Sequence, residues 1–139
     1  EMDMKKQTGD RMKETVLLYG FKDQERLKKV KRALLPLGLR MRTVGPEEYF
    51  QPVGYLAGVK EVPPAENDRP GTEFDCEMMV MAGLASAQVD AVIHALYRSG
   101  VGRIDYKAVL TPVNQFWDGE KLYEEIAREH EAMTKGGSQ

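Results

Sequence analysis

The side chains of this sequence with the clearest potential for ligand binding lie in the segment 105–117. Lys107 and Thr111 would present a positive charge and a hydroxyl group on one face of a strand, as an anion-binding site does. Asn114 would add a hydrogen-bonding group, and Trp117, the only tryptophan of the chain, would supply an apolar wall. This segment is therefore the candidate binding site.

The same four side chains also allow a purely structural interpretation. Lys107 and Thr111 would then alternate outward along the last strand, and Asn114 would cap a turn. Trp117 would pack beneath the final helix of the chain. The two interpretations differ in what Trp117→Ala should do: the structural one predicts a loss of stability, and the binding one predicts a loss of ligand with stability nearly kept.

The segment 107–117 reads Lys-Ala-Val-Leu-Thr-Pro-Val-Asn-Gln-Phe-Trp, with Leu-Tyr-Glu-Glu-Ile at 122–126 and Glu-His at 129–130. These motifs resemble those of a bacterial family of domains of unknown function, number 3783. The family usually has leucine where this chain has Ile126, which is a mild difference. The resemblance covers about residues 75–131. It implies membership of that family, and it implies no reaction, because the family has no established activity.

Conventional catalytic and metal-binding patterns are missing. His94 belongs to a row of charged residues along one side of a predicted helix. His130 has no carboxylate or histidine one helical turn earlier, which a metal site would need. We therefore expect no metal and no cofactor, and an enzyme is less expected than a binding protein. Gly20 and Gly83 each follow a predicted strand; we expect them to form tight turns, although ligands bind near such turns in some regulatory domains.

Composition and charge narrow the class of protein. Of the 139 residues, 42% are hydrophobic and 30% are charged, as in an ordinary globular domain. The net charge is −2, but residues 1–60 carry 13 Lys and Arg against 8 Asp and Glu, whereas residues 61–139 carry 7 against 14. Opposite charges could therefore attract within one fold or between two copies. We expect a cytoplasmic protein with no membrane contact, and Cys76 as a small core residue on a strand.

We do not expect nucleic acid to be a partner. Proteins that bind it usually contain a strongly basic domain, whereas the net charge of this chain is −2. Such binding would need one continuous face formed by Lys28, Lys29, Lys31, Arg32, Arg40 and Arg42.

An internal repeat predicts the fold. A strand at 15–19, a helix that ends near Gly38 and a strand at 39–44 are followed by an equivalent set: a strand at 74–81, a helix at 86–99 and a strand at 104–109. At an offset of 62 the helices superpose Leu27 on Val89, Val30 on Val92, Leu34 on Leu96 and Gly38 on Gly100. Two such units predict an α+β fold of ferredoxin-like βαββαβ topology, with strand order 4-1-3-2 and an additional C-terminal helix at 118–133.

The remaining segments complete the predicted organisation. Residues 1–14 are interpreted as a flexible leader, 15–133 as one domain and 134–139 as a disordered tail. The insert 45–73 interrupts the repeat, and its Tyr49, Phe50 and Tyr55 suggest an exposed interface. Alternatively, the insert folds over the open face of the sheet and completes the core.

These observations favour a small cytoplasmic binding or regulatory module. It would act through protein partners, through self-association such as a homodimer, or through a small anionic ligand. The alternative is an enzyme that acts on a small anionic substrate. In that enzyme Lys107 would anchor the charge, Thr111 and Asn114 would donate hydrogen bonds, and the insert 45–73 would form a lid.

Overall fold

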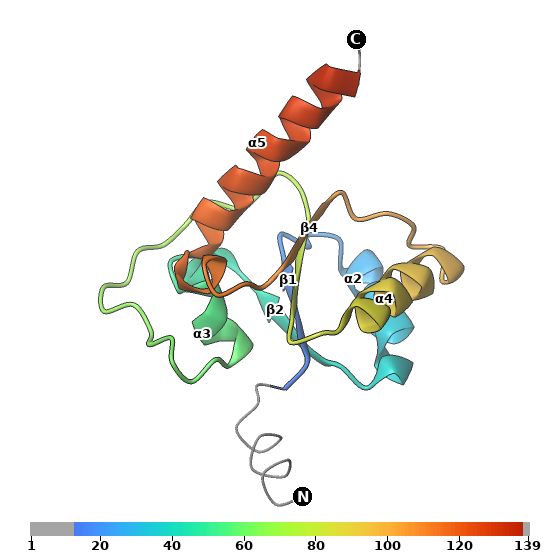
Figure 1. Cartoon of the computed structure of the whole chain (residues 1–139), viewed down its shortest axis with the longest axis horizontal. Coiled ribbons are helices and arrows are strands. Elements are labelled where there is room, and N and C mark those ends of the chain that lie inside the picture. Colours follow the sequence, from blue (N-terminus) through green and yellow to red (C-terminus); the bar gives the residue numbers. More distant parts are fainter. Residues whose placement is uncertain (1–12, 138–139) are drawn as a thin grey trace, which may run out of the picture.

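The computed structural model describes residues 13–137, and the side chains of residues 13–133. Its centre is a four-stranded sheet with the order β2-β1-β3-β4 (Figure 1). The first unit consists of β1 (Thr15–Tyr19), α2 (Gln24–Leu34) and β2 (Arg40–Val44), and the second consists of β3 (Met78–Ala82), α4 (Ser86–Arg98) and β4 (Tyr106–Val109). The mixed α+β class is confirmed.

The strand order differs from the predicted one. Within each unit the two strands are direct neighbours: β1 pairs in parallel with β2, and β3 pairs in parallel with β4. The two units are joined by the antiparallel pair β1 and β3. The predicted order 4-1-3-2 is therefore wrong, and the ferredoxin-like topology is not confirmed. The physical reason is local: each helix returns the chain to the strand beside the one it left, as in an ordinary βαβ unit.

The repeat itself is visible in the backbone. Gly20 and Gly83, which follow the two central strands, have φ values of 74° and 79°. Gly38 and Gly100, which follow the two helical segments, have φ values of 72° and 89°. In this left-handed region glycine is favoured, because other residues carry a Cβ that clashes with the backbone. The matched turns confirm that the two units are structural equivalents.

The sheet is covered on both faces, which explains why β1 and β3 read as continuous apolar runs. Helices α2 and α4 lie on one face, and α3 (Val53–Ala57) and α5 (Gly119–Gly137) lie on the other side of the sheet (Figure 1). Val16 and Leu18 of β1 belong to the core beneath α2 and α4, whereas Leu17 and Tyr19 belong to the core beneath α3 and α5. Short 3₁₀ helices lie between these elements: η1 (Leu35–Leu37), η2 (Pro46–Glu48) and η3 (Asn114–Phe116).

The insert 45–73 completes the second core. Tyr49 is fully buried, its ring centre lies 4.0 Å from that of Phe74, and its hydroxyl donates a hydrogen bond to Glu73. The expected exposed cluster is therefore wrong for Tyr49. Phe50 is half-buried, and Tyr55 is 38% exposed. The insert covers the open sheet face, as the alternative interpretation predicted.

Two predicted boundaries also change. Strand β3 begins at Met78, so Cys76 lies in the preceding loop and its thiol is exposed, and the prediction of a core cysteine on a strand is wrong. The last helix runs beyond residue 133, to Gly137, whereas residues 1–12 and 138–139 of the predicted leader and tail lie outside the described residues. None of the helices in the described part is long and apolar enough to cross a membrane.

Candidate anion-binding site

Lys107 lies on the edge strand β4, on the face of the sheet that α2 and α4 cover. It pairs in register with Met79, whose side chain belongs to the core beneath these helices. Side chains of paired residues in neighbouring strands point to the same face, so Lys107 is directed toward the end of α4. Its Nζ atom donates a hydrogen bond of 2.6 Å to the carbonyl oxygen of Ile104.

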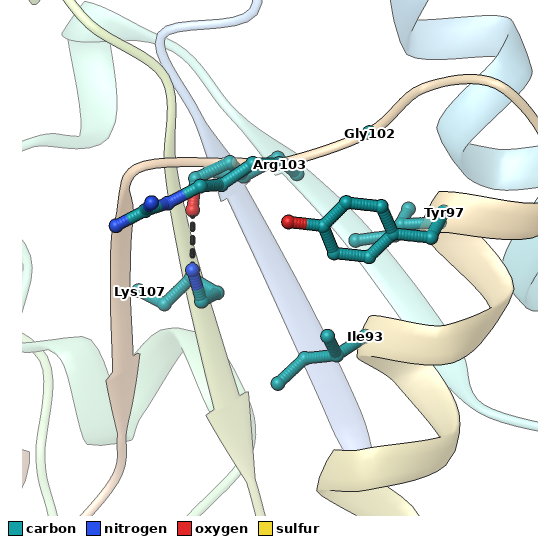
Figure 2. Close-up of a pocket in the computed structure, with 7 residues that line it drawn as sticks. Ile93, Tyr97, Gly102, Arg103 and Lys107 are labelled. Atoms are coloured by element: carbon teal, nitrogen blue, oxygen red, sulfur yellow. Dashed lines mark hydrogen bonds between the residues drawn. The ribbon is translucent and has the colours of Figure 1, made fainter.

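A pocket of about 170 Å³ opens beside this ammonium group. Its walls come from the end of α4, the loop that follows, and β4. Figure 2 shows the Tyr97 hydroxyl directed across the pocket toward Lys107, with Ile93 at one side. The lining residues are Ile93, Leu96, Tyr97, Gly102, Arg103, Ile104 and Lys107. We call this space the Lys107 pocket.

The charges around the Lys107 pocket are mainly positive. Burial lowers the pKa of Lys107 below its ordinary value, and the nearby Arg103 guanidinium lowers it further. The carboxylate of Asp105 opposes this effect, but it already lies 3.1 Å from Nε of Arg103. A half-buried ammonium with a depressed pKa gains stability from a nearby negative charge. A negative charge placed beside Lys107 would therefore offset the cost of burying its ammonium group.

The wall of the Lys107 pocket is held in place by Arg26 of α2. Nε of Arg26 lies 2.7 Å from a carboxylate oxygen of Glu77, and its Nη1 donates a hydrogen bond of 3.1 Å to the carbonyl of Val101. A longer bond of 3.4 Å reaches the carbonyl of Arg103. The first helix thus fixes the loop that carries Arg103, although the residues that line the pocket all come from the second repeat unit.

Sequence reasoning identified Lys107 but missed Tyr97, Arg103 and Arg26. In a parallel βαβ unit the end of the helix lies near the start of the second strand. Tyr97 and Lys107 could therefore have been placed together from the repeat alone. The contribution of Arg26 could not, because it depends on how the two units pack.

Asn114 and Thr111 form a closed turn after β4. The Thr111 N–H donates to Oδ1 of Asn114 at 2.8 Å, and the Asn114 N–H donates to Oγ1 of Thr111 at 3.0 Å. The Asn114 side-chain amide also donates to the carbonyl of Val109 at 3.1 Å. Asn114 is buried, so these bonds occupy its polar atoms within the turn. This geometry supports the structural interpretation of both residues.

Trp117 lies away from Lys107, against the core beneath α3 and α5. Its ring is half-buried, the Nζ atom of Lys121 lies 4.9 Å from the ring centre, and its carbonyl accepts a hydrogen bond of 2.8 Å from the Val53 N–H. Of the four predicted residues of segment 105–117, only Lys107 lines the Lys107 pocket. The structure does not bring it together with Trp117.

Trp117→Ala should lower the free energy of unfolding by roughly 2 kcal/mol, which is less than the cost for a fully buried tryptophan because part of the Trp117 side chain is exposed. Phe116→Ala is the matched control, because the Phe116 side chain is 56% exposed and should change stability little. Urea unfolding measures both variants. A stability of Trp117→Ala equal to that of the wild type would contradict the packing role.

The basic side chains do not form the continuous face that nucleic acid would need. Arg40 and Arg42 of β2 pair in register with Thr15 and Leu17, on the face of the sheet that α3 and α5 cover. The lysines of α2 lie on the opposite side of the sheet. Arg42 also forms an ion pair of 2.8 Å with Glu48. Among the described residues there is no group of three or more His, Cys, Asp or Glu side chains that could hold a metal ion.

Comparison with known proteins identifies one relationship. Residues 77–133 match the model of a family described as a domain of unknown function (DUF3783), which confirms the resemblance drawn from the motifs at 107–130. The match spans β3, α4, β4 and most of α5, and it therefore includes every residue that lines the Lys107 pocket, but not Arg26, which holds the adjoining loop. No curated protein and no solved structure gives a significant match.

Proposed function

We propose that this protein, whose residues 77–133 belong to the DUF3783 family, is a small cytoplasmic binding or regulatory module that takes a small anion in the Lys107 pocket. The observation that supports this most strongly is the half-buried ammonium of Lys107. Its hydrogen bond to the Ile104 carbonyl uses one of three N–H groups, and the others can serve a ligand.

The size of the pocket limits the ligand. A volume of about 170 Å³ suits a single phosphate or a short carboxylate better than a nucleotide. Lys107 and Arg103 would supply the positive charge, and the Tyr97 hydroxyl would donate a hydrogen bond. Ile93 and Ile104 would exclude water from one side of the ligand, which strengthens the charge interaction.

The geometry gives less support to an enzyme built on the segment 105–117. Thr111 and Asn114 use their polar groups in a turn, and Trp117 packs on the other core. The insert 45–73, which would be the lid, anchors Tyr49 in that core. A binding role needs none of these residues to move.

Calorimetric titration with inorganic phosphate, and separately with acetate, tests the proposal. We expect wild-type protein to bind at least one of these anions and Lys107→Met to bind it more than 10-fold more weakly, because a charge-assisted hydrogen bond is lost. Lys31→Met is the matched control, since Lys31 is an exposed lysine of α2 outside the pocket.

Tyr97→Phe provides a second, more conservative variant. It keeps the ring that lines the pocket and removes only the hydroxyl, so binding should weaken about 10-fold, the cost of roughly one hydrogen bond to a charged group. Equal affinity of wild type and Lys107→Met for every bound anion would refute the site. Absence of binding of both anions to the wild type would refute the proposed ligand class.

A further inference from the structure

Cationic and small apolar side chains line the groove between α2 and α4. Lys29, Arg32 and Arg98 supply three positive charges and Ala33, Pro36 and Ala95 supply apolar surface, around a volume of about 380 Å³. No acidic residue lines it. Within the described part of the chain, none of its three cations forms an ion pair. We call it the helical groove.

The end of α5 has the complementary character. The start of this helix packs on its own sheet through Leu122 and Ile126, but its distal part stands clear of the body (Figure 1). The apolar seam continues along the helix to Met133, which is 77% exposed. Glu129 lies one turn before Met133 on the same side, and both Glu129 and Ala132 are exposed.

We propose that the distal part of α5 of one copy docks into the helical groove of a second copy of this chain. Met133 would contact the apolar side chains of the groove, and Glu129 would approach the guanidinium groups of Arg32 and Arg98. The charge distribution of the chain favours this pairing, because residues 1–60 are net basic and residues 61–139 are net acidic. Association goes beyond the proposed anion binding and does not depend on it.

In this arrangement, helix α5 of a molecule cannot occupy the helical groove of the same molecule. Helix α5 begins on the face of the sheet opposite α2 and α4 and points away from the body (Figure 1). The two complementary surfaces of one molecule are therefore both available to other copies. Mutual docking would give a closed dimer, and one-way docking would give longer assemblies.

Sedimentation velocity of the full chain, at about 1 mM because small polar interfaces are weak, tests the proposal. Two charge-reversed variants are compared with the wild type: Arg32→Glu with Arg98→Glu in the helical groove, and Glu129→Lys with Ala132→Lys on α5. We expect the wild type to associate at low salt and to dissociate at high salt. Each variant alone should associate more than 10-fold more weakly than the wild type.

An equimolar mixture of the two variants should associate again, because the acidic groove then meets the basic helix and the basic groove meets the acidic helix. Recovery in the mixture also shows that both variants are folded. Lys28→Glu with Lys31→Glu is the matched control, because it reverses two charges on the same helix outside the groove and should still associate. A wild type that stays monomeric at low salt, or a groove variant that associates like the wild type, would overturn the proposal.

Discussion

Gly20→Ala is expected to destabilise the protein by roughly 3 kcal/mol or more, whereas Gly38→Ala should cost only about 1 kcal/mol. Both glycines have nearly the same backbone conformation, with φ values of 74° and 72°. A Cβ atom at Gly38 would meet nothing within 4 Å, but a Cβ atom at Gly20 would lie 2.8 Å from the carbonyl oxygen of Cys76. The two variants thus differ by a steric clash with the backbone of Cys76.

Urea unfolding of the two variants measures this difference. If both variants lost the same free energy of unfolding, the turn after β1 would relax freely around the added Cβ. That result would contradict the close contact between Gly20 and the Cys76 carbonyl. Gly83 has the same positive φ, so glycine is favoured there for its backbone conformation.

Stability should also fall steeply above pH 10, by about 3 kcal/mol between pH 8 and pH 11. Burial raises the pKa of Tyr19 and of Tyr49 well above the ordinary tyrosine value, and the Glu73 side chain raises the pKa of Tyr49 further. In the unfolded chain both hydroxyls lose their protons near pH 10. The folded state holds these protons longer, so the unfolded state is favoured as the pH rises.

Variants separate the two tyrosines. Tyr49→Phe should remove about half of the alkaline loss. Tyr19→Phe should do the same and should raise stability at pH 7 by about 1 kcal/mol or more, because the buried Tyr19 hydroxyl has no hydrogen-bond partner among the described residues. Unfolding measured by circular dichroism from pH 8 to pH 11 gives both quantities. A flat profile for the wild type would contradict the burial of these hydroxyls.

The repeat made much of the fold predictable, because Val30 and Val92 occupy equivalent core positions and Gly38 and Gly100 equivalent turns. The strand order was not predictable in the same way. The predicted order and the observed order both place β1 beside β3, and periodicity along one strand carries no information about its outer neighbour. The burial of Tyr49 depends on Phe74, which lies far along the chain.

The candidate site was predictable only in part. Lys107 was a candidate because it begins the motif at 107–117 and lies on a predicted strand. Alternation along that strand does not show which face of the sheet its side chain occupies. The register with Met79 decides that, and it separates Lys107 from Trp117. Tyr97 at the end of α4 could have been placed near β4 from the repeat, but the position of Arg103 depends on the Arg26 contacts to its loop, which no local pattern encodes.

The most direct test of the central claim is the pKa of the Lys107 ammonium, measured by NMR with and without inorganic phosphate. We predict a pKa below the ordinary lysine value in the free protein and a rise on addition of phosphate, because the bound anion stabilises the charged form. Lys31, an exposed lysine outside the pocket, serves as the control, and phosphate should leave its NMR signal unchanged. A Lys107 pKa that is ordinary and insensitive to phosphate would contradict the anion site.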